Sequence, residues 1–420
     1  MIVMVTWGSF GDLHPYIAVA RGLRDRGHSV TLATCPTYRA KVESEGLWHA
    51  PYPPDVSELL GNPEALRRSY DLHTGTEYVI RSVVLPRLEE AWNALLPVCK
   101  GADLVVGHPL AYTVPLVSER LGIPWLSVAL QPAAMFSSFD PPYLPRARWL
   151  YSLRRLGHQP FAALFALGKQ RAVAWGRPVL ELRRKLGLPE PVASPLLEGS
   201  FSPWGTMAWF SSILGEPQPD WPPRTRVTGF PFYDRLEPGK GTPEELTRFL
   251  ESGPPPLVFT LGSSASLEAG TFYKESALAA MALGQRAVLL TGLEGRNHLP
   301  PLPETIIAAD YAPFSELFPR ASAIVHQGGI GTTAQALRSG RPMLVVPYSH
   351  DQPDNAERVL RAGCGLTIPR GRYTADRAAA KLRALLDDQT CSARAAAAGR
   401  RIGAEDGVAA ACDFITDAAR

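Results

Sequence analysis

The chain alternates short apolar runs with longer stretches in which apolar residues recur every three or four positions. Runs rich in Val, Ile and Leu are typical of strands in a parallel sheet, because helices cover both faces of such a sheet. Residues 14–26 show the helical spacing, with Ile17, Ala20 and Leu23 on one face. The runs expected as strands are Ile2–Thr6, Ser29–Thr34, Asp103–Gly107 and Trp125–Leu130 in the first half, and Leu257–Leu261, Ala287–Thr291, Thr305–Ala309, Ala323–His326, Met343–Pro347 and Gly365–Pro369 in the second. This alternation predicts a doubly wound α/β protein.

Chain length and proline content predict two domains. The 420 residues exceed what one ordinary hydrophobic core organises. Residues 216–243 are dense in proline, which interrupts helices and central strands and is typical of a linker. We therefore expect an N-terminal domain over 1–215, the linker over 216–243, a C-terminal domain over 244–395, and a final helix over 396–420 that packs back on the N-terminal domain.

Composition narrows the class of protein. The 43 Lys and Arg nearly balance the 40 Asp and Glu, and no basic stripe points to a nucleic-acid partner. Five cysteines without a CxxC pair predict neither a disulfide framework nor a zinc site. The apolar start of the chain lacks the basic region of a signal peptide, and no apolar run is long enough for a membrane span. These features predict a cytoplasmic protein without a transmembrane segment; whether it touches a membrane surface stays open.

The turn after the first expected strand carries the first candidate site, Gly8-Ser9-Phe10-Gly11-Asp12-Leu13-His14-Pro15. Its two glycines permit a tight turn and close approach of a ligand. Asp12 falls at the C-terminal edge of the strand, where open α/β sheets bind ligands. The alternatives are that Asp12 only caps the next helix and that His14 is an ordinary surface histidine. The glycine spacing differs from GxGxxG, which argues against a dinucleotide-binding fingerprint.

Residues 323–333, Ala-Ile-Val-His-Gln-Gly-Gly-Ile-Gly-Thr-Thr, run from a strand through a glycine-rich turn into a helix. The backbone N–H groups of Gly329, Gly331 and Thr332 would converge at the helix N-terminus and form a seat for a diphosphate. His326 could donate a hydrogen bond to a phosphate oxygen and offset charge on a departing nucleotide. The alternative is a plain strand-to-helix turn with a buried histidine.

Three further strand ends carry candidate side chains. Asp351 and Gln352 follow one strand, and a carboxylate beside a carboxamide can recognise sugar hydroxyls. Capping of the next helix by Asp351 or Asp354 is the alternative. Ser263 follows another strand and adds a hydroxyl at the same sheet edge. Tyr311 could stack on a nucleobase or only pack against its neighbours.

Together these motifs resemble the family 1 glycosyltransferases, which have the GT-B fold: two facing Rossmann-like domains with parallel sheets and a cleft between them. The resemblance covers nearly the whole chain and is most specific where His326–Thr333 is followed by His350–Ala356. Within the family the chain is similar to bacterial enzymes that act on sterols, macrolides and other antibiotics. The segments Asp220–Pro223 and Thr228–Asp234 resemble the rhamnolipid rhamnosyltransferases in particular.

The resemblance implies roles for single positions. Asp12 would be the general base, where plant relatives have His. The plant signature also places a Glu on the ribose near position 335, where this chain has Gln335 or Ala334, so uridine and deoxythymidine both stay open. Donor binding would involve Gly11, Ser263, Tyr311, Ala312, His326, Gly328, Gly329, Gly331, Thr332, Asp351 and Gln352, and acceptor binding would involve Phe10, His14, His108, Met135 and Phe136.

The reaction implied is inverting transfer of a hexose, of glucose or rhamnose type, from a UDP- or dTDP-sugar to a hydroxyl of an apolar small molecule. Asp12 would accept the hydroxyl proton, and His326 with the helix N-terminus would stabilise the leaving diphosphate. Because no DxD carboxylate pair is placed to hold a metal, we expect a metal-independent enzyme with no cofactor beside the nucleotide sugar. The aromatic residues of 132–153 would suit a flavonoid, polyketide, sterol or lipid acceptor.

Other functions stay open at this point. The chain could be a rhamnosyltransferase that acts on a hydroxy-fatty-acid lipid. A sugar-nucleotide epimerase of the same fold would show no dependence on an apolar acceptor. A non-catalytic sugar-nucleotide-binding protein would not need Asp12 beside a complete donor signature. The assembly expected is a monomer or a weak homodimer.

Overall fold

The computed structural model describes residues 1–191, 193–234, 241–292 and 299–419, and within them all side chains except those of 146, 148, 169–172, 263 and 264. The chain folds into two compact units. Unit 1 comprises Met1–Tyr233 and Asp406–Arg420, and unit 2 comprises Asp234–Glu405.

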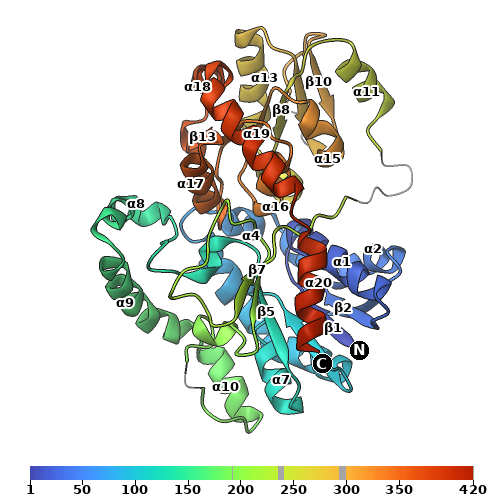
Figure 1. Cartoon of the computed structure of the whole chain (residues 1–420), viewed down its shortest axis with the longest axis vertical. Coiled ribbons are helices and arrows are strands. Elements are labelled where there is room, and N and C mark those ends of the chain that lie inside the picture. Colours follow the sequence, from blue (N-terminus) through green and yellow to red (C-terminus); the bar gives the residue numbers. More distant parts are fainter. Residues whose placement is uncertain (192, 235–240, 293–298, 420) are drawn as a thin grey trace. The chain divides into compact units, whose positions relative to one another are not determined.

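A parallel sheet forms the centre of unit 1 (Figure 1). Within the described residues it has seven strands in the order β3-β2-β1-β4-β5-β6-β7. The strands β1, β4 and β5 are buried along their whole length, as their apolar runs predict. The strands are β1 Ile2–Val5, β2 Val30–Thr34, β3 Trp48–Pro51, β4 Leu104–Gly107, β5 Trp125–Ala129, β6 Thr206–Ala208 and β7 Thr225–Val227.

Helices connect the strands of unit 1, and α1 (Phe10–Asp25) follows β1 directly. Its Tyr16, Ile17 and Leu23 are fully buried. The other helices are α2 Arg39–Ser44, α3 Val56–Leu60, α4 Pro63–Ser69, α5 Gly75–Tyr78, α6 Leu88–Cys99, α7 Val114–Leu121, α8 Arg148–Tyr151, α9 Gln159–Trp175, α10 Arg177–Lys185 and α20 Gly407–Ala418, with shorter turns η4 Pro132–Met135 and η6 Ser152–Leu156.

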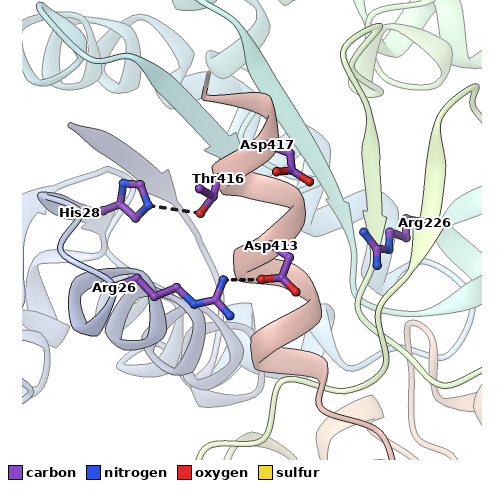
Figure 2. Close-up of a pocket in the computed structure, with 6 residues that line it drawn as sticks. All are labelled: Arg26, His28, Arg226, Asp413, Thr416 and Asp417. Carbon is purple, nitrogen blue, oxygen red and sulfur yellow. Dashed lines mark hydrogen bonds and ion pairs between the residues drawn. The ribbon is translucent and has the colours of Figure 1, made fainter.

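The last helix, α20, packs against α1 although it follows unit 2 in the sequence. A Cβ atom at Gly22 of α1 would lie 2.8 Å from both the Cys412 Sγ and a Val408 methyl, so the glycine permits this close approach. At the surface Arg26 donates to Asp413 at 2.7 Å, and the His28 and Thr416 side chains lie 3.2 Å apart (Figure 2). These polar contacts border a shallow hollow on unit 1.

Unit 2 contains a second parallel sheet, with six strands among the described residues in the order β10-β9-β8-β11-β12-β13. Each strand matches one expected from the sequence: β8 Leu257–Thr260, β9 Ala287–Leu290, β10 Ile306–Ala309, β11 Ala323–His326, β12 Met343–Val345 and β13 Gly365–Thr367. The helices are α11 Glu244–Glu251, α12 Gly262–Ala265, α13 Phe272–Leu283, α15 Phe314–Leu317, α16 Ile330–Arg338, α17 Gln352–Ala362, α18 Ala375–Asp387 and α19 Gln389–Gly403. The two sheets confirm the expected α/β architecture of two domains.

The structure differs from the expected elements mainly in unit 1. Three strands, β3, β6 and β7, were not expected, and β7 lies within 216–243, the stretch expected as a linker. The segment 396–420, expected as one helix, holds the end of α19 and all of α20. Among the described residues no helix combines the length and the apolar character needed to cross a membrane.

Candidate functional site

The turn between β1 and α1 places Asp12 at the end of the sheet. Ser9 precedes the helix, and its hydroxyl accepts a hydrogen bond from the Gly11 N–H at 3.2 Å. In return, Asp12 Oδ2 accepts from the Ser9 N–H at 2.8 Å, which completes a capping box. Gly8 has φ of +133°, and a Cβ atom there would overlap the Asp12 carboxylate. Asp12 therefore does cap α1, but with only one of its two oxygens.

The other oxygen of Asp12 faces His108. This histidine directly follows β4, which pairs with β1, so the two strand ends meet at one edge of the sheet. His108 Nε2 lies 3.3 Å from Asp12 Oδ1, and His108 Nδ1 accepts a hydrogen bond from the Leu110 N–H at 3.1 Å. Because Nδ1 accepts this hydrogen bond, the hydrogen of the neutral imidazole must be on Nε2.

This tautomer decides which group of the pair can act as a base. His108 donates to Asp12 and has no nitrogen lone pair left, whereas the carboxylate keeps lone pairs for a further proton. The Asp12 side chain is 31% exposed, and that of His108 is 4% exposed. Asp12 is thus the accessible proton acceptor, and His108 orients it. His108, expected as an acceptor contact, lies beside the candidate base.

Two buried polar groups lie near this pair. The rings of Tyr16 and Trp209 meet edge-on at 4.7 Å, and the Tyr16 ring lies 6.1 Å from that of His108. The Tyr16 hydroxyl and the Trp209 indole N–H are buried without a hydrogen-bond partner among the described residues. Burial, together with the negative charge of Asp12, raises the pKa of Tyr16 well above its ordinary value. No sequence motif points to these two residues, because they are far apart in the chain.

Phe10 and His14, expected as acceptor contacts, form an aromatic cluster on the exposed side of α1. The Phe10 ring lies 5.2 Å from His14 and 5.1 Å from Tyr38, and it is 38% exposed. His14 stacks on Tyr233 at 4.8 Å, and the Tyr233 hydroxyl donates to the buried Glu45. Phe10 presents apolar surface, whereas the His14 ring packs within unit 1.

Met135 and Phe136, the other expected acceptor contacts, belong to the turn η4 and its end. Met135 is buried, whereas Phe136 is 50% exposed and has φ of +46°, which is unusual for a residue with a Cβ. Asp220 holds the next two residues, because its carboxylate accepts from the Ser137 hydroxyl at 2.6 Å and from the Ser138 N–H and hydroxyl at 2.6 and 2.7 Å. This clamp fixes the loop that presents Phe136.

In unit 2 the turn from β11 to α16 has the open geometry expected of a phosphate seat. Gly328 has φ of +88°, and a Cβ atom there would lie 2.7 Å from a Val345 methyl. Gly329 is the N-cap of α16, and a Cβ atom at Gly331 would meet nothing within 4 Å. The first N–H groups of a helix have no partner within it, so these of α16 are available to an anion.

His326 makes contacts other than the expected one. Its ring is fully buried, Nδ1 accepts from the Gly328 N–H at 3.0 Å, and Nε2 lies 3.4 Å from the Met343 sulfur. Burial lowers its pKa to about 3, so the ring is neutral at pH 7. A phosphate contact would require the ring to give up one of these partners. Its catalytic role stays a prediction, and in this structure it shapes the turn.

The residues expected to contact the sugar lie at the start of α17. Asp351 is the N-cap residue but makes no side-chain capping bond, and Asp354 pairs with the buried Arg358 at 2.6 Å. Capping by the Asp351 side chain is therefore wrong. Asp351 Oδ2 accepts at 2.6 Å from Asn355, whose amide also donates to the Gly328 carbonyl at 2.9 Å. Asn355 thus joins the start of α17 to the glycine-rich turn.

Gln352 is held by its amide oxygen, which accepts from the Tyr348 N–H at 2.8 Å and the Ser349 N–H at 3.1 Å. Its amide nitrogen is the group that stays available for a sugar hydroxyl. Gln327, which the sequence analysis missed, is buried between the turns after β8 and β11. A Cβ atom at Gly262 or Gly329 would lie within 3 Å of its amide nitrogen.

The remaining donor-site residues follow β8 and β10. Tyr311 is 50% exposed, which suits stacking better than packing, and Ala312 is buried. Thr332 lies buried in the first turn of α16. The side chain of Ser263 lies outside the described residues. Gln335, which with Ala334 is a candidate for the position of the plant ribose ligand, donates to Asp234 at 3.1 Å.

Among the described residues there is no group of three or more His, Cys, Asp or Glu that could hold a metal ion. All five cysteines are buried thiols. Metal-independent transfer stays a prediction.

Comparisons with known proteins match parts of both units. Residues 2–134 match the N-terminal domain of glycosyltransferase family 28, and 277–406 match the C-terminal domain of erythromycin biosynthesis protein CIII-like. O-mycaminosyltylonolide 6-deoxyallosyltransferase of Streptomyces fradiae is 34% identical over 99% of this chain and 97% of its own length. Sterol 3-beta-glucosyltransferase UGT80A2 of Arabidopsis thaliana is 31% identical over 98% of this chain and 64% of its own.

Solved structures share the fold over the whole chain. The glycosyltransferase of kitacinnamycin superposes with a TM-score of 0.71 at 24% identity, covering 99% of this chain and 98% of its own. The calicheamicin glycosyltransferase CalG4 superposes with a TM-score of 0.73 at 19% identity, with the same coverage. The resemblance to macrolide and sterol enzymes is confirmed, and the chain belongs to the family 1 glycosyltransferases with the GT-B fold.

Proposed function

We propose that this glycosyltransferase moves a hexose from a UDP- or dTDP-sugar to a hydroxyl of an apolar small molecule, with inversion at the anomeric carbon. The acceptor oxygen attacks the anomeric carbon, the bond from that carbon to the diphosphate breaks, and the acceptor proton passes to Asp12. The Streptomyces fradiae relative is named for transfer of a 6-deoxyallosyl group to a tylonolide, which supports a macrolide or similar polyketide acceptor here.

The observation that carries this proposal is the arrangement of the Asp12 carboxylate. One oxygen is fixed by Ser9 and the other by the His108 Nε2–H, so the group is oriented before substrate arrives. A positioned base contributes roughly 10²–10⁴-fold to the rate. His108 cannot replace it, because its second nitrogen accepts from Leu110.

The donor is proposed to bind unit 2 through the turn before α16. The N–H groups of the first turn of α16 would bind the diphosphate and stabilise the charge that develops as it leaves. Tyr311 would stack on the base, and Asp351 with the Gln352 amide nitrogen would bind the sugar hydroxyls. Because helix N–H groups supply the stabilisation, we propose that transfer needs no metal ion.

The experiment combines binding and turnover. UDP-glucose or a dTDP-hexose should raise the melting temperature more than GDP-mannose or NAD, since a ligand at 100 times its Kd stabilises by about 2.7 kcal/mol. The same donors are then offered with a macrolide aglycone, a flavonoid, a sterol and a hydroxy fatty acid, with and without EDTA, and the anomeric configuration is read by NMR.

Each alternative gives a distinct result. Product only from the hydroxy fatty acid and a dTDP-rhamnose donor would identify a lipid rhamnosyltransferase. Conversion of the donor sugar without acceptor would identify an epimerase, and donor binding without any product would identify a binding protein. Stabilisation by NAD at least equal to that by UDP-glucose would overturn the proposal.

A further inference from the structure

The helix α9 is mainly apolar on its outer face as well as on its inner one. Toward the interior of unit 1 it presents Phe161, which is 3% exposed, with Leu164, Phe165 and Trp175 partly buried. Each residue turns the helix by about 100°, and seven of the described exposed positions fall within an arc of about 140° on the opposite side. Six of these seven side chains are apolar, namely Ala162, Ala163, Ala166, Leu167, Val173 and Ala174, and the seventh is Gln159. A helix at the surface of a globular protein normally carries polar side chains there.

The segments packed next to α9 also expose large apolar side chains. Trp149 of α8 is 66% exposed, Leu156 of η6 is 71% exposed, and Leu167 of α9 is 60% exposed. Figure 1 shows the helices α8 and α9 set apart from the strands β5 and β7 of unit 1. We call Trp149, Leu156 and the six α9 residues the α9 surface. Clustered exposed hydrophobic side chains of this kind mark an interaction surface.

The charge of the same segment indicates what the α9 surface contacts. Residues 141–180 contain seven of the 43 Lys and Arg of the chain and none of its 40 Asp and Glu. Arg155 and Arg177 are exposed and form no ion pair among the described residues. Two copies of such a segment would repel each other, and an uncharged acceptor molecule has no use for the excess charge. An anionic partner complements it.

We propose that the α9 surface docks unit 1 on an anionic lipid bilayer. Trp149, Leu156 and Leu167 would enter the boundary between headgroups and acyl chains, and the exposed Arg155 and Arg177 would lie at the anionic headgroups. Because four of the six α9 residues are alanines, the apolar contribution is small and binding depends on charge. The docking is independent of the proposed transfer reaction and would bring the enzyme to acceptors dissolved in the membrane.

Co-sedimentation of the full-length protein with vesicles tests this proposal. We expect binding to vesicles of phosphatidylcholine with phosphatidylglycerol, at least about 10-fold weaker binding to phosphatidylcholine alone, and release at high salt. Leu167→Glu and Arg155→Glu should each weaken binding about 10-fold or more. The matched controls are Trp48→Glu, at a side chain of β3 that is 75% exposed, and Arg67→Glu, at an exposed site of α4; each should change binding less than about twofold. Melting curves check that all variants fold.

Several results would overturn the proposal. Equal binding to neutral and anionic vesicles would contradict the electrostatic argument, and no binding to either would contradict docking altogether. An effect of Trp48→Glu equal to that of Leu167→Glu would mean that the α9 surface is not the site. Dimerisation in light scattering that Leu167→Glu abolishes, without vesicle binding, would assign the surface to a second copy of the chain.

Discussion

Replacing Asp12 with Asn should distinguish the proposed catalytic role of Asp12 from its capping role, because each carboxylate oxygen has a different partner. Oδ2 accepts from Ser9, and Oδ1 accepts from the His108 Nε2–H. Asn has one carbonyl oxygen and one NH₂ group, so whichever way it turns, one partner donor meets another donor. The variant keeps the volume of the side chain but loses the lone pairs that could take the acceptor proton.

The two losses differ in size and in what they affect. Loss of a positioned base should lower kcat by about 10²-fold or more, which corresponds to about 2.7 kcal/mol of activation free energy. Loss of the capping interaction should lower the free energy of unfolding by about 1 kcal/mol. Donor affinity should change little, because all the residues expected to bind the donor except Gly11 belong to unit 2.

A Ser9→Ala variant provides the matched control. It removes the hydroxyl that accepts from Gly11 but leaves the Asp12 carboxylate and its His108 contact in place. It should lose about as much stability as Asp12→Asn while its turnover stays within a few-fold of the parent. The assay is kcat and donor Kd on one acceptor, with a melting curve for each variant. Loss of turnover in Ser9→Ala equal to that in Asp12→Asn, or retention of most turnover by Asp12→Asn, would show that Asp12 serves only as a cap.

Two further predictions concern unit 2. Asp351→Asn keeps an oxygen for the Asn355 amide but removes a charged acceptor for sugar hydroxyls. Transfer should therefore fall about 10-fold or more, while the Kd of free UDP or dTDP does not rise. A parallel loss of nucleotide affinity would contradict the assignment of Asp351 to the sugar. His326, with its pKa of about 3, is neutral in the folded chain and protonates near pH 6.5 when unfolded, so stability should fall as pH drops below about 6.5. Between pH 7 and pH 5 the free energy of unfolding should fall by about 2 kcal/mol for this reason. His326→Gln should abolish this fall in melting curves recorded across the pH range, whereas the control His73→Gln, at an exposed site, should not. Equal pH profiles for the two variants would contradict the burial argument.

The structure gives Asp12 both roles that the sequence left as alternatives. The capping box is present, and it leaves the second oxygen free to meet His108. For His326, by contrast, the sequence did not reveal the surroundings of the side chain. Its place before the glycines is evident from the sequence, but its burial depends on Met343 of the neighbouring strand β12. A histidine at the end of a central strand loses solvent when the next strand pairs with it, and no local pattern records that.

Elements with a local signal could be predicted from the amino-acid pattern alone. The six strands described in unit 2 belong to this group, because each is a short, mainly apolar run, and β8, β9, β11 and β12 are buried along their whole length. The glycine-rich turns are evident because only glycine permits such close approach. The short strands β6 and β7 were missed, because three residues carry no period.

Which distant residues meet depends on the tertiary structure. His108 lies 96 positions from Asp12, and Asp220 lies 82 positions from Ser138, yet both pairs are in hydrogen-bond contact. Such pairings depend on the order of strands in the sheet. Long connections between parallel strands set that order, and the spacing of hydrophobic residues does not encode it. The outer face of α9 is a further case, because only the fold shows that Leu167 and its apolar neighbours lie at the surface.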